Sequence, residues 1–185
     1  MLAMKTILIY ISILCYTVNV YAQTNYYPTT KTFYEAGYTY QCDVAPSKMA
    51  ILYNKSNQWT YADQVYKSSG KPFIMPDNHF LDLTDNESWK RNRPKLNSIV
   101  NAAFSTEEKQ RVEGHKLGLG LYINPITGKV DEVLFEFATF TPYSTIPVSV
   151  YRKIEMDIKN NISYTLTPEG KLLNIIGMWW SQEVE

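Results

Sequence analysis

Two histidines and an acidic segment are the first candidates for acid–base chemistry or metal binding. His79 lies within residues 77–85, which lack the central glycine and the ligand spacing of a calcium loop. No second histidine stands at zinc-ligand spacing, and His115 follows Gly114 at a predicted strand start. We therefore expect no metal and no cofactor, with His79 in a polar loop and His115 exposed. Only a cluster of His79, Asp82 and glutamate side chains in a cleft would point to an enzyme.

Other catalytic patterns are also absent from the sequence. Glu132 and Glu136 would face one side of a strand, about 13 Å apart at the usual rise per residue. Glycosidase carboxylates are at most about 9.5 Å apart, so we expect both glutamates on the solvent side of a sheet. The fragment 118–120 lacks the remaining residues of a phosphate loop, and no serine stands in a G-x-S-x-G turn. The sequence predicts a non-catalytic protein.

Aromatic side chains are the remaining candidates for contact with a ligand. The chain has 15 Tyr, 4 Trp and 7 Phe, and tyrosine suits a partly solvated surface because it combines a ring with a hydroxyl. Trp179 and Trp180 would point to opposite faces of one strand. Either N-terminal strands cover the second face, which their need for a packing surface favours, or one Trp marks a binding patch. The same two alternatives apply to Trp59, Tyr61 and Tyr66. They either pack within the fold or form a platform that binds a peptide or glycan.

Apolar periodicity in the first part of the chain predicts strands. Residues 38–44 alternate between apolar and polar side chains, as in a half-buried strand. Segments 49–53 and 59–61 flank the turn-forming residues 54–57 and predict a hairpin. Residues 23–31 are polar and rich in tyrosine, and we expect them to be loose.

Two helices are predicted in the middle of the chain. Apolar residues over 96–104 form one stripe at helical spacing. Pro94 is tolerated in a first turn but not in a helix interior, so this helix is expected to begin there and not at Asp85. Ser105 begins a capping box, which predicts a second short helix through Val112.

The last third of the chain predicts the order strand, strand, helix, strand. Alternation predicts strands over 117–123 and 133–137, and Pro147 precedes a helix with one apolar stripe. Glu155 is expected on the solvent side of this helix. Residues 172–180 predict a closing strand that is apolar on both faces.

This order resembles the TonB C-terminal-like domain within residues 113–183. The matching pieces are Leu119 to Asn124, Gly128 to Val130, Val148 to Lys159, Tyr164 to Gly170, and Leu172 to Trp180. The whole chain also resembles an uncharacterised family of exported proteins from Gram-negative gut anaerobes. The resemblance implies a role in protein interaction. Energy coupling is not expected, because a TonB transducer needs an uncleaved membrane helix and a long Pro-rich spacer.

The first 22 residues have the features of a cleavable signal peptide. Lys5 precedes an apolar run over residues 6–20. Val20, Tyr21 and Ala22 then form a small-residue cleavage pattern of the V-x-A kind before Gln23. The run is shorter than the roughly 20 residues that a membrane-spanning helix needs. We expect cleavage after Ala22, no stable transmembrane anchor, and a periplasmic or outer-membrane-associated protein.

Charge and cysteine content limit the classes of partner and the cellular compartment that we expect. The 18 basic residues equal the 18 acidic ones, and no basic run is present, which argues against nucleic acid. Cys15 leaves with the signal peptide, so Cys42 has no partner for an internal disulfide. We expect Cys42 to be a small buried apolar residue in a bacterial envelope protein.

The sequence thus predicts a single α+β domain over residues 23–185. It comprises a C-terminal β-β-α-β unit, an N-terminal β extension and one or two additional helices. We expect a non-catalytic exported protein that binds an envelope protein or peptide. The alternative is a glycan-binding module that uses surface Tyr and Trp. The candidate contact residues are Trp179, Trp180, Trp59 and Tyr61.

Overall fold

The computed structural model describes residues 24–74 and 83–185. The predicted signal peptide, Cys15, His79 and Asp82 lie outside these ranges. Six strands form one antiparallel sheet in the order β1-β2-β3-β5-β4-β6. Their bounds are β1 Lys31–Glu35, β2 Tyr38–Val44, β3 Met49–Asn54, β4 Lys116–Ile123, β5 Val130–Ala138 and β6 Ile176–Glu183.

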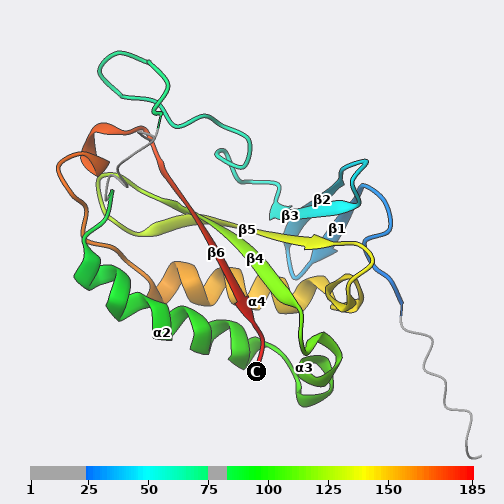
Figure 1. The fold of residues 1–185 in the computed structure, drawn as a ribbon. Helices are drawn as coiled ribbons and strands as arrows, with labels where there is room; N and C mark the ends of the chain where they lie inside the picture. The colour runs from blue at the N-terminus through cyan, green and yellow to red at the C-terminus, as the bar shows by residue number, and fades with distance from the viewer. Residues whose placement is uncertain (1–23, 75–82) are drawn as a thin grey trace, which may run out of the picture.

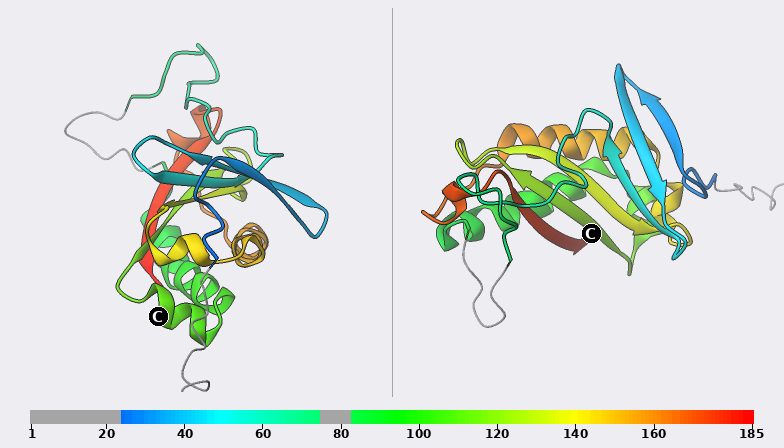
Figure 2. Two further views of the ribbon diagram at one scale, coloured as in Figure 1. Left: turned by 90° about the vertical axis from the view of Figure 1, so that its right-hand side faces the viewer. Right: turned by 90° about the horizontal axis from the view of Figure 1, so that it is seen from above.

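Helices α2 (Asn86–Ala103) and α4 (Val148–Asn161) lie side by side on one face of the sheet, called here the helix face (Figure 1). The short helix α3 (Thr106–Val112) follows α2 and leads into β4. Figure 2 shows that the chain after β3 passes over the opposite face, called here the outer face. The α+β class is therefore confirmed.

The main core fills the space between the helix face and the two long helices. Side chains that alternate along β4 and β5 meet the apolar stripe of α4, as the periodicity predicts. The buried residues of these three elements include Leu117, Leu119, Leu121, Ile123, Val133, Phe135, Phe137, Val150, Tyr151, Ile154 and Ile158. Phe137 stacks on Tyr151 with 5.4 Å between ring centroids.

The N-terminal strands extend this sheet and do not cover its second face. β3 pairs with β2 on one side and with β5 on the other. The predicted hairpin of 49–53 with 59–61 is therefore wrong, and residues 59–61 form a turn. The cause is the buried carboxylate of Glu132, which accepts hydrogen bonds from the backbone N–H groups of Gln58 and Trp59 at 2.6 and 2.9 Å.

The segment before β1 is anchored, contrary to the expectation that residues 23–31 are loose. The Tyr27 side chain is fully buried, and its hydroxyl donates to the Ile146 carbonyl at 2.9 Å. The ring lies 5.0 Å from Phe33, 5.2 Å from Phe137 and 5.9 Å from Tyr151, measured between centroids. Tyr27 thus ties the start of the described chain to the core.

Helix α2 begins after Asp85 and not at Pro94. Asp85 is the N-cap, and its carboxylate accepts a hydrogen bond from the Ser88 backbone N–H. Pro94 lies inside the helix on the exposed side. The Lys90 carbonyl, which loses its helical partner there, also belongs to an exposed residue, so water can replace the missing N–H. The capping box at Ser105 is confirmed.

Helix α4 carries a buried carboxylate that the sequence places in water. Glu155 is only 1% exposed because the N-terminal strands pack over that side of α4. The Tyr40 hydroxyl donates a hydrogen bond to Glu155, and Lys159 lies 3.7 Å from it. Burial raises the pKa of Glu155 despite these two partners.

The closing strand begins at Ile176, four residues later than the expected Leu172. Residues Gly170–Leu172 form a turn of 3-10 helix instead. The Asn174 side chain then accepts a hydrogen bond from the Val65 backbone N–H at 2.8 Å, which holds the approach to β6 against the chain that follows β3.

Candidate functional site

The two adjacent tryptophans of β6 lie on opposite faces of the sheet, as strand alternation predicts. Trp180 is half-buried on the helix face, where its ring lies 5.3 Å from Trp89 and 5.5 Å from the Arg93 guanidinium. Trp179 points to the outer face and is 61% exposed. The expectation that the whole second face is covered is wrong, because the N-terminal strands join the sheet edge to edge.

Only part of the outer face is covered, and the cover is the loop after β3. Tyr122, Leu134 and Ile175 form a second small core, against which Trp59 packs. The Tyr122 hydroxyl donates to the Thr60 carbonyl at 3.0 Å and holds the loop in place. Trp59 is therefore partly buried between the loop and the outer face.

Trp179 stands free because its neighbour across the strand pair is a glycine. In the sheet register Trp179 lies opposite Gly120, followed by Leu134 of β5 and Tyr53 of β3. The Leu134 side chain leans over Gly120, where an added Cβ would lie 2.8 Å from the leucine Cγ. The side of Trp179 that faces β4 therefore meets no side chain from its direct partner.

β6 is an edge strand whose own residues include few of the usual devices against pairing. It pairs with β4 on one side, and no other strand in residues 24–74 and 83–185 pairs with its free side. Natural edges are commonly blocked by Lys, Pro, a bulge or short length. β6 has eight residues, contains neither Lys nor Pro, and carries its only charge at Glu183. The opposite edge, β1, has five residues and a charge at each end, Lys31 and Glu35.

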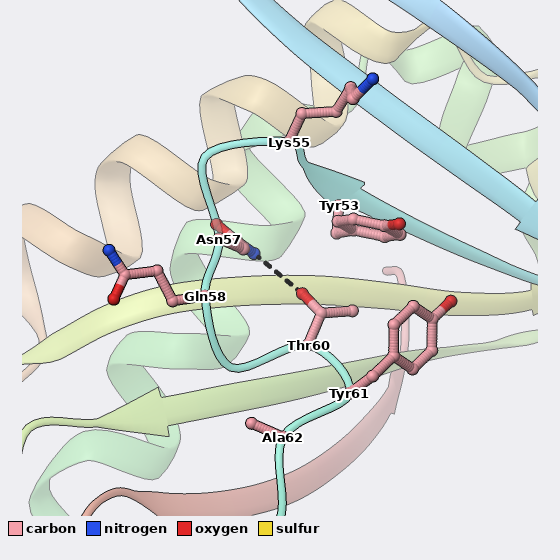
Figure 3. A pocket seen from close by; sticks show the side chains of 7 residues that line it. All are labelled: Tyr53, Lys55, Asn57, Gln58, Thr60, Tyr61 and Ala62. Carbon is pink, nitrogen blue, oxygen red and sulfur yellow. Dashed lines mark hydrogen bonds between the residues drawn. The ribbon is translucent and has the colours of Figure 1, made fainter.

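A second candidate surface is a depression beside the loop after β3, called here the tyrosine pocket (Figure 3). Its volume is about 400 Å³. It is lined by Tyr53, Lys55, Asn57, Gln58, Thr60, Tyr61 and Ala62. Tyr61, one of the predicted contact residues, is 63% exposed, and its ring stands nearly perpendicular to Tyr53 with 5.8 Å between centroids.

The carboxylate of Asp43 fixes both rings of this pocket. It accepts hydrogen bonds from the hydroxyls of Tyr53 and Tyr61 at 2.9 and 2.8 Å, and from the Gln41 amide at 2.9 Å. Burial alone would raise the pKa of Asp43, but the three hydrogen bonds outweigh it, so the pKa lies below its usual value. Burial, followed by the bond to Asp43, raises the pKa of Tyr53 to about 12. At neutral pH a carboxylate therefore anchors two neutral phenols.

Of the residues considered for catalysis, His115, Glu132 and Glu136 lie in the described ranges. His115 is exposed, as predicted, and its carbonyl accepts a hydrogen bond from Tyr143. Glu132 is buried against the loop and not solvated, which corrects the expectation for this residue, and Glu136 is half-buried. Within the described ranges no three His, Cys, Asp or Glu side chains are grouped as metal ligands would be. Cys42 is buried, and burial raises the pKa of its thiol to about 12.

Sequence reasoning missed Asp43 and Tyr53. Both occupy polar or ambiguous positions of the paired strands β2 and β3, and the hydrogen bonds from Tyr53 and Tyr61 to Asp43 connect all three residues. The one available signal was the polar side of the strand 38–44, on which Gln41 and Asp43 are neighbours.

None of the helices in the described ranges has both the length and the apolar composition needed to cross a bilayer. The resemblance to the TonB C-terminal-like domain stays a prediction. No curated protein matches the chain.

A crystal structure at 1.85 Å resolution of a DUF5043 family protein from Bacteroides uniformis matches this fold with a TM-score of 0.78. That protein is 37% identical in sequence, and the match covers 88% of this chain and 89% of the other. The family model of DUF5043, a domain of unknown function, matches residues 23–180. The chain therefore belongs to the DUF5043 family.

Proposed function

We propose that this protein is an exported, non-catalytic binding protein that accepts an extended strand of a partner protein along the free side of β6. The observation that carries this proposal is the unprotected edge itself, with Trp179 exposed near its middle. A long apolar edge strand that is not blocked is prone to pair with another chain, so its retention calls for a function.

The chemistry of the edge suits an extended peptide. Backbone N–H and C=O groups on the free side of β6 would bond to the added strand and supply affinity without regard to sequence. Specificity would come from side chains that alternate along the peptide, one set of which would lie against Trp179 on the outer face. The ring is large and stiff, so little side-chain freedom is lost when a partner covers it.

Export is part of the proposal. The family model begins at residue 23, directly after the predicted cleavage site at Ala22. Tyr27 is already packed into the core, so cleavage at that point would leave only a few residues ahead of the fold. The N-terminal sequence of the chain recovered from fractionated cells tests this step. A start at Gln23 in an envelope fraction supports it, and a chain that keeps Met1 in the cytoplasm contradicts it.

Site-specific photo-crosslinking tests strand addition. A photoreactive amino acid replaces Trp179 in one variant and Tyr34 in a matched control, because Tyr34 is 83% exposed and lies on the opposite edge strand, β1. Both are irradiated in cells of the natural host. We expect position 179 to yield one defined adduct that is absent at position 34, and mass spectrometry identifies the linked segment.

A variant that restores edge protection completes the test. Trp179→Lys places a positive charge in the middle of the edge and should abolish binding of the linked segment, supplied as a synthetic peptide. Tyr34→Lys should leave binding unchanged. Equal adducts at both positions, an adduct with a second copy of this chain, or a Trp179→Lys variant that binds normally would each contradict the proposal.

A further inference from the structure

The tyrosine pocket is separate from the β6 edge and presents a preorganised aromatic surface. Tyr61 is 63% exposed, yet its hydroxyl is fixed to Asp43 at 2.8 Å and its ring packs edge-on against Tyr53. A ligand that stacks on Tyr61 therefore does not have to order the ring first, which lowers the cost of binding. Figure 3 shows the hydroxyls of Tyr53 and Tyr61 pointing the same way, with Lys55 at the rim.

The rest of the lining is polar and mixed in hydrogen-bonding character. The Asn57 amide nitrogen donates to the Val133 carbonyl at 3.2 Å and to the Thr60 hydroxyl at 3.5 Å, while no described residue donates to its Oδ1 atom. Thr60 adds a hydroxyl group. Lys55 brings the only formal charge among the lining residues, and none of the carboxylates in the described ranges forms an ion pair with it. The volume of about 400 Å³ falls within the range of small-molecule sites.

From this combination we infer that the tyrosine pocket binds one pyranose ring of a glycan. The apolar C–H face of the ring stacks on Tyr61, because polarised C–H groups are attracted to the negative face of an aromatic ring. Sugar hydroxyls bond to Asn57 and Thr60. Lys55 gives a sugar that carries a carboxylate an additional charge-assisted contact, so uronic-acid glycans bind more tightly than neutral glycans.

The experiment applies the purified chain to an array of neutral and uronic-acid oligosaccharides and measures the affinity of the best ligand by calorimetry. Tyr61→Ala removes the stacking ring and should weaken binding by about tenfold or more. Tyr61→Phe keeps the stacking ring but loses the bond to Asp43, so its affinity should lie between those of the wild type and Tyr61→Ala. Phe140→Ala is the matched control, since Phe140 is 79% exposed but lies outside the pocket. Thermal unfolding of each variant verifies that it is folded.

Two further variants separate the parts of the inference. Lys55→Met should remove the preference for uronic acids while neutral sugars still bind. Trp179→Lys should leave sugar binding unchanged, because Trp179 lies three strands from Tyr53, roughly 14 Å at normal strand spacing. Failure of strand addition at β6 therefore does not affect this test. An array without signal, a folded Tyr61→Ala variant with normal affinity, or sugar binding lost in Trp179→Lys would overturn the inference.

Discussion

Replacement of Glu132 by Ala should release the loop after β3 without opening the main core. Its carboxylate accepts the Gln58 and Trp59 backbone N–H groups at 2.6 and 2.9 Å. A hydrogen bond to a charged group contributes roughly 1.5–3 kcal/mol to stability, so two would sum to about 3–6 kcal/mol. Gln58 is exposed, and water can take over part of its bond. We expect the free energy of unfolding to fall by about 3 kcal/mol.

Urea unfolding and amide hydrogen exchange measure the two parts of this prediction. Exchange at Gln58 and Trp59 should accelerate strongly in Glu132→Ala, and Glu132→Gln should lose about half as much stability because one acceptor oxygen remains. Glu136→Ala is the matched control on the same strand. It is half-buried, makes no side-chain hydrogen bond to a described residue, and should change stability by less than about 0.5 kcal/mol. The reasoning is refuted if the Glu132 and Glu136 variants are equally stable and the loop amides exchange as before.

Three other substitutions test the fold. Pro94→Ala should raise the free energy of unfolding by about 2 kcal/mol, because it restores a helical hydrogen bond inside α2; a loss in urea unfolding would argue that the helix is broken there. Gly128→Ala should cost more than about 2 kcal/mol, since φ is +71° and a Cβ would lie 2.0 Å from the Tyr164 carbonyl oxygen; a normal melting temperature would contradict this geometry. The folded pKa of Glu155 is raised, so its contribution to stability is complete below the unfolded pKa of about 4.3 and is lost as pH rises through the folded pKa. The stability of Glu155→Gln should therefore fall less than that of the wild type between acidic and neutral pH. Parallel pH profiles of the two proteins would contradict the raised pKa of Glu155.

Local periodicity predicts much of the C-terminal fold but does not predict which charged side chains are buried. The strands near 117–123 and 133–137 follow from alternation alone, because it depends on neighbouring residues. Glu155 and Glu132 are buried by partners far away in the sequence, 115 residues for Tyr40 and 74 for Gln58. No pattern around either glutamate indicates these partners.

In the candidate sites, too, local patterns predict some features, and contacts between distant parts of the chain determine the others. Strand alternation placed Trp179 and Trp180 on opposite faces, but only the pairing of β3 with β5 decides that the N-terminal strands leave Trp179 uncovered. Tyr61 comes to Asp43 across 18 residues because the loop is held on the outer face. Neither contact has a local signature in the sequence.

Hydrogen exchange along β6 tests strand addition most directly. The chain is mixed with the synthetic peptide that photo-crosslinking at position 179 identifies, and amide exchange is compared with and without it. In an antiparallel pair every second residue of the edge strand bonds to its new neighbour. The proposed function predicts slowed exchange at alternate amides within residues 177–183, none in β1, and no effect in Trp179→Lys. Uniform protection elsewhere with β6 unchanged would contradict it.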